Sequence, residues 1–321
     1  MADATLGRDG PRRRARLAPA LQIGLPAVTL LLMLAVIFWI RPPAMSYFGF
    51  TLLFKLAVPL MLASLAQMLV IMLGDIDLSN GAFVGFITCV TALYLDAEPA
   101  LAVAIYATSI VVYALVGLLI HLRRLPSIII TLGMSFIWLG TAIILLPAPG
   151  GTAPAWLTGF MAWRPSLVPL PIVLAVAAAL AGHLVITRSS YGVILRGVGA
   201  NPRAVERAGW SVALLRAAVY AAAGGLACLA GLTLTGLTTS GDPNIAPAYT
   251  LLGVGAVVLG GGAFTGGIVS PIGTVIGALT LALAGSLLSF LQVPPTWQIG
   301  AQGGILFLVL AGRLLLSEKR P

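Results

Sequence analysis

Hydrophobic residues occupy most of the chain in long runs that short polar stretches separate. Runs of about 20 apolar residues are long enough to cross the roughly 30 Å hydrocarbon core of a bilayer as an α-helix. Strands of a membrane barrel would alternate apolar and polar residues in segments of about ten, and these runs do not alternate. Ten runs can be marked, at residues 21–40, 52–73, 79–95, 100–120, 127–146, 167–187, 213–235, 249–265, 271–291 and 299–316. The pattern predicts an all-α polytopic membrane protein with about ten transmembrane helices.

The composition agrees with this class. The chain of 321 residues is 60% hydrophobic and 8% charged, and its mean hydropathy is +1.07. Soluble domains carry about a quarter charged residues, so the chain cannot be one. The formal net charge of +9 would suggest nucleic acid as the partner of a soluble protein, but here the positive-inside rule accounts for it. We therefore expect membrane lipid, and no nucleic acid, among the partners.

The positions of the basic residues predict an orientation. Besides the N-terminal leader, arginines gather at Arg123–Arg124 and within residues 188–212. Under the positive-inside rule these segments lie in the cytoplasm, and ten alternating spans place them there together with both termini. Arg41, Lys55 and Arg164 fall on the other side and weaken the pattern. The sequence predicts a multi-pass protein whose N- and C-termini are cytoplasmic.

No segment outside the spans is long enough to fold by itself, because polar stretches of about 20 to 25 residues cannot bury a core. We expect a cytoplasmic arginine-rich leader at 1–20, one membrane domain at 21–316 and a cytoplasmic tail at 317–321. The chain has no G-x-x-x-x-G-K-[ST] string for binding nucleotide phosphates. Its cysteines, Cys89 and Cys228, lie in apolar runs without metal-ligand spacing. Neither an enzyme nor a cofactor or metal site is predicted.

The densest polar segment beyond the leader lies at 188–212. Asn201-Pro202 is typical of a helix start, with Asn201 as the N-cap and Pro202 in the first turn. Gly209 would end this helix after about two turns, and Gly197–Gly199 would precede it as a flexible stretch. A loop that only sets topology needs scattered basic residues, not a capped helix. The pattern favours a contact in the aqueous phase through Gly199, Asn201, Arg203, Ala204, Glu206, Arg207 and Gly209.

Two aspartates lie between the second and third apolar runs, within residues 74–81 (GDIDLSNG). A carboxylate in the middle of a membrane costs about 2.5–3.5 kcal/mol on insertion scales, so it is usually retained for function. The neighbouring Gly, Ser and Asn residues predict a broken helix and hence a polar turn. Asp77 is expected to cap the third span by accepting from the backbone N–H of Ser79 or Asn80. A role in lining or gating a pathway stays open, above all for Asp75.

Glycine is concentrated in residues 260–277. An interior glycine costs a helix about 0.5–1 kcal/mol relative to alanine in water, so this density needs a reason. Gly273 and Gly277 have the spacing of small residues that let membrane helices approach closely. The triplet at 260–262 is denser than packing requires, which predicts a broken or re-entrant segment at 260–273 with a bend near Gly262. Gln67 and Thr131, polar residues inside other spans, are expected to form interhelical hydrogen bonds.

Three segments together resemble a known family. Residues 196–210 (RGVGANPRAVERAGW) resemble the coupling motif of bacterial ABC-importer permeases of the ribose and simple-sugar type. Residues 74–81 resemble the family's Gly-Ile-Asp-Leu-Ser signature, and residues 257–279 resemble its glycine-rich segment. The three motifs occur in the family's order, and the resemblance covers the chain from about residue 50 to residue 316.

The resemblance implies a permease of the bacterial plasma (inner) membrane that pairs with a second copy or a paralogue. It also implies two ABC ATPase subunits, which bind the ATP and receive the helix at 201–209, and a periplasmic or lipid-anchored solute-binding protein. We expect the substrate pathway or gate at Asp75, Asp77, Ser79, Asn80 and Gly262, and docking of the binding protein at Asp242 and Asn244 in a predicted outside loop.

The chain departs from the family at Tyr249-Thr250-Leu251-Leu252, where such permeases usually carry Tyr-Glu-Leu-Asp. The loss of both carboxylates, at Thr250 and Leu252, argues against a typical ribose specificity. The expected function is ATP-driven import of a small polar solute, a monosaccharide, by alternating access. Two alternatives stay open: a branched-chain amino-acid permease of the same superfamily, and an ion-coupled secondary transporter, which would leave the capped helix unexplained.

Overall fold

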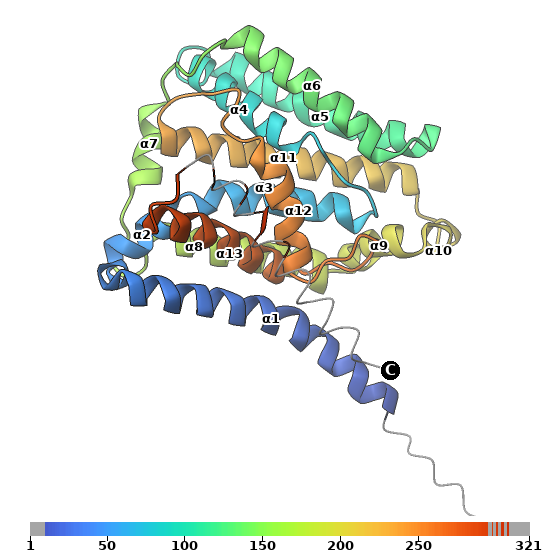
Figure 1. Cartoon of the computed structure of the whole chain (residues 1–321). Coiled ribbons are helices and arrows are strands. Elements are labelled where there is room, and N and C mark those ends of the chain that lie inside the picture. Colours follow the sequence, from blue (N-terminus) through green and yellow to red (C-terminus); the bar gives the residue numbers. More distant parts are fainter. Residues whose placement is uncertain (1–9, 295–296, 298–299, 301–302, 305–306, 308–321) are drawn as a thin grey trace, which may run out of the picture.

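The structure is a computed structural model that describes residues 10–294, 297, 300, 303–304 and 307. Figure 1 shows a layered bundle of helices that lie side by side. In chain order its elements are α1 (Gly10–Ile40), η1 (Pro42–Met45), α2 (Tyr47–Lys55), α3 (Ala57–Met72), α4 (Asn80–Tyr94), α5 (Pro99–Arg123), α6 (Ser127–Leu145), α7 (Ala155–Ala162), α8 (Leu170–Gly182), η2 (His183–Arg188), α9 (Ser190–Ala200), α10 (Pro202–Arg207), α11 (Val212–Thr238), α12 (Ala248–Leu259) and α13 (Pro271–Phe290).

The predicted class, an all-α membrane protein, is confirmed. Among the described residues, five helices are long and apolar enough to span a membrane: α5, α6, α8 with η2, α11 and α13. A sixth span results if α2 and α3, which meet at a bend of 42°, count as one. The helices α4 and α12 are apolar but short, because a break in the chain truncates each. The count of ten is therefore not confirmed within the described residues, and the predicted span at 299–316 lies almost wholly outside them.

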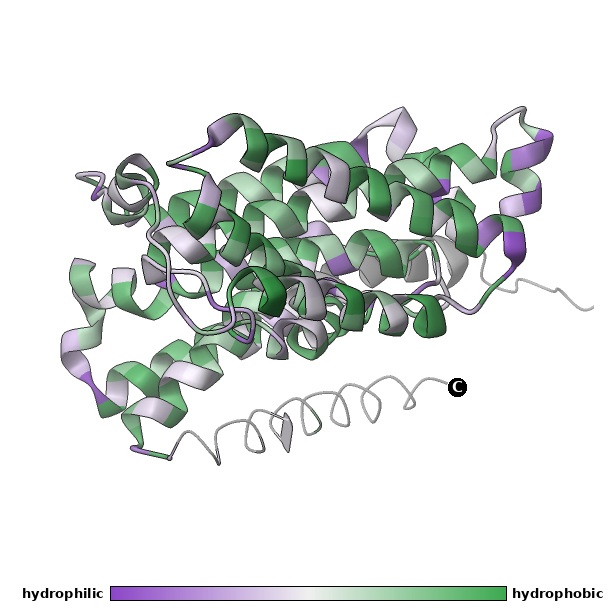
Figure 2. Ribbon diagram, turned by 90° about the horizontal axis from the view of Figure 1, so that it is seen from above, coloured by the Kyte–Doolittle hydropathy of each residue, from purple (hydrophilic) through white to green (hydrophobic). Residues whose placement is uncertain are grey.

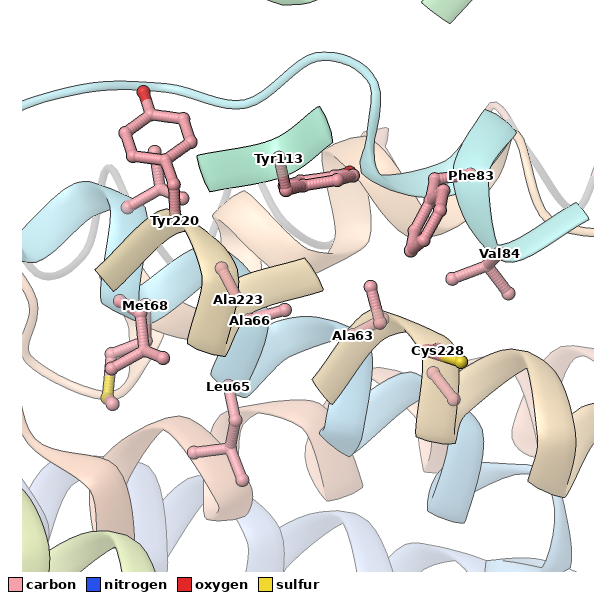
Figure 3. Packing of buried hydrophobic residues seen from close by; sticks show 14 of the residues in the cluster. Ala63, Leu65, Ala66, Met68, Phe83, Val84, Tyr113, Tyr220, Ala223 and Cys228 are labelled. Atoms are coloured by element: carbon pink, nitrogen blue, oxygen red, sulfur yellow. The ribbon is translucent and has the colours of Figure 1, made fainter. Parts of the chain in front are cut away.

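The centre of the bundle is α3, whose residues are all buried except Leu62. It packs against α11, α12 and α13. Figure 3 shows the small side chain of Ala66 on α3 beside that of Ala223 on α11. Small residues let helix backbones approach closely, which supplies packing where lipid offers no hydrophobic driving force. This core fixes the C-terminal end of α3, where the chain leaves the helix.

A reciprocal fit joins α5 and α11. The ring of Tyr220 on α11 covers Gly117 on α5, where an added Cβ would lie 2.6 Å from the ring. The ring of Tyr113 on α5 covers Gly224 on α11 in the same way, at 2.9 Å. Each glycine thus makes room for a tyrosine of the other helix. The fit brings both phenols into the interior, and their hydroxyls reach the break that follows α3.

The outer helices present apolar surface to their surroundings. Large hydrophobic side chains on α5, α6 and α8 are exposed, among them Ile129, Phe136 and Val176. Figure 2 shows hydrophobic residues along the lengths of the helices and hydrophilic residues mainly toward the ends of the bundle. This distribution is the one expected for helices whose outer faces contact lipid.

The two ends of the bundle carry different elements. In Figure 1, α2 and α7 lie at one end, and α9 and α10 lie at the other. The sequence pattern did not predict α7, which falls in the proline-rich stretch 147–166. At the α7 end, an isolated antiparallel bridge joins Gly150 to Gly241 and so ties the loop before α7 to the loop after α11.

Candidate functional site

The chain leaves helical geometry between α3 and α4, over residues 73–79 (the first break). Non-helical backbone at membrane depth is tolerated where protein groups satisfy its N–H and C=O groups. Ser127 Oγ at the start of α6 accepts from the N–H of Ile76 at 3.2 Å. One turn later, Thr131 Oγ1 accepts from the N–H of Leu78 at 3.0 Å. The hydrogen bond predicted between Thr131 and another helix is formed instead with the non-helical backbone of the break, and α6 holds one side of the break.

Gln67 of α3 holds the other side. Its buried carboxamide, oriented with the nitrogen toward the carbonyl of Asp77, donates to that oxygen at 3.0 Å. In the same orientation its oxygen accepts from the N–H of Asp77 at 3.2 Å. The polar residue predicted inside this span therefore replaces two backbone hydrogen bonds that a continuous helix would have made.

The carboxylate of Asp77 is buried and occupied by protein donors. Its Oδ1 accepts from the N–H of Ser79 at 2.7 Å and from Ser79 Oγ at 2.6 Å. Tyr113 Oη of α5 donates to Oδ2 at 3.1 Å. The predicted bond to the N–H of Ser79 is confirmed, and it fixes the turn that leads into α4. Asp77 thus organises the first break from within.

Asp75 lies on the same break but faces α11. Its Oδ2 forms an ion pair with Arg216 Nη2 and accepts from Tyr220 Oη at 3.0 Å. The side chains of Asp75 and Arg216 are only 13% and 12% exposed. An unpaired charge in such a place is costly, so each charge depends on the other. The pair joins the first break to the N-terminal turns of α11, which follows α10 directly.

A second break separates α12 from α13, over residues 260–270. The N–H of Gly262 donates to the carbonyl of Val257 at 2.8 Å and closes the end of α12. Gly261 has a φ of +99°, a conformation that L-residues rarely adopt. The predicted interruption and its bend near Gly262 are confirmed. The helix itself ends at Leu259, six residues before the end of the apolar run that was marked in the sequence.

Beyond this second break, α13 packs closely on α12. A Cβ at Gly273 would lie 1.9 Å from the carbonyl oxygen of Gly260, and one at Gly277 would lie 2.4 Å from that of Ala256. Both glycines are therefore needed for close approach of two helices, as their spacing predicted.

The polar segment at 188–212 folds into α9 and α10. Asn201 Oδ1 accepts from the N–H of Ala204 at 3.2 Å, and Gly209, with a φ of +86°, follows the helix end. The predicted capped helix is confirmed. The prediction of a flexible stretch at Gly197–Gly199 is wrong, because these residues form the last turn of α9, where packing on both sides offsets the poor helix propensity of glycine.

The helix α10 is held by one residue and exposes the rest. Val205 is its buried residue, and it contacts Gly197 of α9, where a Cβ would lie 3.0 Å from Val205 Cγ2. Of the residues predicted to contact a partner, Gly199 is half-buried, and the exposed ones are Asn201, Arg203, Ala204, Glu206, Arg207 and Gly209. A partner in the aqueous phase can therefore reach α10 without any change in the fold.

Through backbone atoms, the C-terminal end of α9 meets the second break and the last residue of α3, which directly precedes the first break. A Cβ at Gly199 would lie 1.9 Å from the carbonyl oxygen of Met72, at the end of α3, and 2.7 Å from the nitrogen of Gly267. The N–H of Gly267 donates to the same carbonyl at 2.8 Å. Gly266, with a φ of +79°, lies against the carbonyl of Gly199. We call this contact of Met72, Gly199, Gly266 and Gly267 the glycine junction.

The N-terminus of α4 contacts the start of α12. Thr250 Oγ1 accepts from the N–H of Gly81 at 2.9 Å. Thr250 therefore supplies an uncharged acceptor at a position where ABC-importer permeases of the simple-sugar type usually carry a carboxylate. Asn80 donates to the carbonyl of Ala63 at 2.9 Å, while its Oδ1 has no hydrogen-bond partner within the described residues. The polar interior of the first break is thus largely, but not wholly, satisfied.

Asp242 and Asn244 lie at the other end of the bundle, in the loop between α11 and α12 (Figure 1). Asp242 Oδ1 accepts from the N–H of Asn244 at 2.8 Å, as in an Asx turn. Thr88 of α4 bonds to the backbone of Asp242 at 3.2 Å. Asn244 is exposed and Asp242 is half-buried, so a partner at this end can reach the turn.

The structure therefore brings the predicted residues of the breaks close to those of the α9–α10 segment. The predicted docking residues Asp242 and Asn244 lie apart from both, at the other end of the bundle. Asp75, Asp77 and Ser79 lie on the first break, Asn80 begins α4 directly after it, and Gly262 lies on the second break. The end of α9 contacts the second break and Met72, the residue directly before the first break. Three residues of the site were not predicted from the sequence: Arg216, Tyr113 and Tyr220. A lone arginine inside an apolar run is an unusual position that points to a buried partner, and this signal was available for Arg216. Nothing in the sequence singles out the two tyrosines.

Comparison with known proteins settles the class of this bundle. Residues 49–310 match the family described as Branched-chain amino acid transport system / permease component. The chain belongs to this family. The match extends over all of α3 to α13 and so includes both breaks and α10. It confirms the resemblance to ABC-importer permeases and shows a multi-pass transport permease.

Three curated permeases illustrate the similarity. The Ribose import permease protein RbsC of Escherichia coli is 28% identical over 292 residues, which cover 88% of this chain and 91% of that protein. The Autoinducer 2 import system permease protein LsrC of Salmonella choleraesuis is 28% identical over 283 residues, or 84% and 80%. The Xylose transport system permease protein XylH of Haemophilus influenzae is 32% identical over 143 residues, which span only 44% of this chain and 38% of that protein. No solved structure matches the chain significantly.

Proposed function

We propose that this chain is the membrane permease of an ATP-driven importer, and that α10 is its docking helix for separate ABC ATPase subunits. The observation that carries the proposal is the glycine junction. The same segment that exposes α10 to solvent also contacts, through Gly199, the second break and Met72, the last residue of α3 before the first break. Because α9 runs to Ala200 without a flexible linker, a displacement of α10 reaches the second break and the edge of the first break.

The surface of α10 suits a polar contact. Arg203, Glu206 and Arg207 are exposed, and none of them forms an ion pair within the described part of the chain. Tyr191 and Trp210 form an edge-to-face pair with ring centroids 6.3 Å apart, which braces the start of α9 against the segment after α10. A rigid, charged and solvent-exposed helix can be moved as a unit by a partner.

The transport step that we propose is alternating access driven from α10. When the ATPase subunits close, α9 shifts against Met72 and the segment at 266–267. The ion pair of Asp75 and Arg216 makes the start of α11 follow the first break. Coupling of this kind requires an element with two discrete arrangements, and the two breaks are segments of the bundle interior that regular helical hydrogen bonds do not hold.

The cargo that we propose is a small, polar and uncharged solute, a monosaccharide. Asp75 is paired with Arg216, and Asp77 is occupied by Ser79 and Tyr113, so neither carboxylate is free to balance a charged solute. The relatives named for ribose and autoinducer 2 import align over most of the chain. Branched-chain amino acids, after which the family is described, are the second candidate. An ion-coupled transporter is not favoured, because it needs a carboxylate that can bind and release the coupling ion, whereas protein groups occupy both Asp75 and Asp77.

The remaining partners follow from this assignment. A second copy of the chain or a paralogue would complete the permease, and a periplasmic or lipid-anchored solute-binding protein would dock at the end that carries Asp242 and Asn244. The α10 end is then cytoplasmic, together with both termini. The arginines at 123–124, 188, 203 and 207 lie at that end and agree with the positive-inside rule.

The test uses the charge-reversed variants Arg203→Glu and Glu206→Arg, which alter exposed residues without disturbing the buried Val205. We expect ATP-dependent uptake and co-purification of the ATPase to fall together, each by more than tenfold. Glu98→Arg is the matched control, because Glu98 is exposed at the other end of the bundle. Retention of both ATPase association and uptake in the α10 variants would falsify the coupling role. Uptake by vesicles that contain the permease alone, abolished by a protonophore, would instead establish the ion-coupled alternative.

A further inference from the structure

Two basic residues share a pocket at the end of the bundle opposite α10. Lys55 ends α2, Arg164 lies two residues beyond α7, and both line a pocket of about 240 Å³. Within the part of the chain that the structure describes, neither side chain forms an ion pair. Lys and Arg are rarer at the outer end of membrane proteins than at the cytoplasmic end. Two unpaired cations in one pocket there call for an anionic ligand.

The pocket combines these cations with apolar walls. Its buried lining residues are apolar, namely Val58, Met161, Leu170 and Pro171. Its exposed lining includes the rings of Phe48 and Trp163. The pocket is smaller than the 300–1,000 Å³ typical of sites that enclose a whole small molecule. Its size and lining therefore fit one part of an amphipathic ligand, with a charged group beside an apolar one.

The geometry of the pocket is held by two contacts between α2 and the segment after α7. Tyr47 Oη donates to the carbonyl of Pro165 at 2.6 Å. The guanidinium of Arg164 lies 5.9 Å from the ring centroid of Phe48, within the range of a cation–π interaction. The position of Arg164 beside α2 is thus built into the fold.

Exposed tryptophans mark the depth of this pocket in the membrane. Trp39 near the end of α1, Trp156 in α7 and Trp163 are 88%, 63% and 57% exposed. The α2 and α7 end of the bundle carries all three (Figure 1). Exposed tryptophans gather at the membrane–water interface, where lipid headgroups lie. The pocket therefore opens at the level of phospholipid phosphates.

We propose that this pocket binds the phosphate-bearing headgroup of a membrane phospholipid, with Lys55 and Arg164 as the cationic partners and the apolar lining against the glycerol and the first methylene groups. A soluble acidic protein surface would not need the buried apolar lining, and a free anion would not need it either. The orientation of the bundle given under the proposed function decides only which leaflet supplies the lipid, namely the outer one. Lipid binding at this pocket requires neither an ATPase subunit nor a transported solute.

The experiment titrates the full-length permease, purified in detergent and stripped of lipid, with phosphatidylglycerol, and measures binding by native mass spectrometry and by the shift in unfolding temperature. Each basic residue near a membrane surface raises the affinity for anionic lipid roughly fivefold. We therefore expect Lys55→Gln and Arg164→Gln to weaken binding roughly fivefold each, and the double variant about 25-fold. Arg41→Gln is the matched control, because Arg41 lies at the same end but not in the pocket lining.

Three results would overturn the proposal. Equal binding of phosphatidylglycerol by wild type and double variant excludes these cations as its site. Saturation by inorganic phosphate at the same concentrations as the lipid assigns the site to a free anion. If the double variant no longer binds the solute-binding protein but still binds phosphatidylglycerol as the wild type does, the two cations belong to the docking surface for that protein. Since Lys55 is half-buried and its replacement can disturb α2, the exposed Arg164→Gln variant decides if the two single variants disagree.

Discussion

Asp75 on the first break and Arg216 on α11 form a mostly buried ion pair, and Tyr220 donates a hydrogen bond to the same carboxylate oxygen. The two residues are 141 positions apart in the chain, and they join the segment that follows α3 to the helix that follows α10. A buried pair of this kind adds little net stability compared with an apolar pair, but the loss of one partner leaves an unpaired charge. This asymmetry makes the pair testable.

We predict that Arg216→Met and Asp75→Leu each lower the free energy of unfolding by about 3–5 kcal/mol, because each leaves one buried charge alone. The double variant Asp75→Leu/Arg216→Met should recover at least half of that loss. Unfolding in mixed micelles, followed by circular dichroism, measures the three values. Tyr220→Phe is the control, because it removes only the hydrogen bond to the Asp75 carboxylate, and it should lower the free energy of unfolding by about 1.5–3 kcal/mol. Additive losses in the double variant would mean that the two charges do not depend on each other.

The glycine junction predicts a large effect from one methyl group. In Gly199→Ala the new Cβ meets the carbonyl of Met72, which cannot move without the end of α3. Overpacking of this kind costs about 1–3 kcal/mol, and we expect ATP-dependent uptake to fall more than tenfold while the ATPase still associates. Gly133→Ala on α6 is the matched control, since no atom lies within 4 Å of its added Cβ. Full uptake by Gly199→Ala would contradict coupling through this contact.

Thr250 is predicted to stabilise the start of α4 through its hydroxyl. Thr250→Val keeps the shape of the side chain but leaves the N–H of Gly81 without its acceptor. The expected loss in the free energy of unfolding is about 1–3 kcal/mol, the penalty for a buried unsatisfied donor. Thr250→Ser retains the acceptor and should lose clearly less. Equal stability of the valine variant and the wild type would show that this bond adds nothing.

Gln67 is predicted to be the most sensitive polar residue of α3. Gln67→Met has a similar length but leaves both the N–H and the carbonyl of Asp77 unsatisfied. We expect a loss of about 2–5 kcal/mol and a lower yield of folded protein. Ser64→Ala is the matched control in the same buried helix, because the Ser64 hydroxyl bonds only to Leu60 of its own helix. If both variants unfold at the same temperature, Gln67 does not support the break.

The sequence alone determined the class of the fold and the positions of its two helix breaks. Apolar runs exclude a soluble domain, since so few charged residues cannot cover a water-exposed surface. Glycine, aspartate and serine at 74–81 and glycine at 260–262 marked both breaks, because these residues favour backbone outside a helix. The cap at Asn201 and the stop at Gly209 were also readable, since capping depends on residues within one turn.

Only the tertiary structure decided which residues these breaks contact. The carboxylate of Asp75 has its partners on α11, and that of Asp77 has a partner on α5 besides Ser79 of its own turn. The partner of Gly199 is a backbone carbonyl of α3. The helical state of Gly197–Gly199 was mispredicted for the same reason, because glycine propensity is local whereas the packing that overrides it is not. Local chemistry specifies where a helix begins and ends; contacts across more than a hundred residues exist only once the helices have packed.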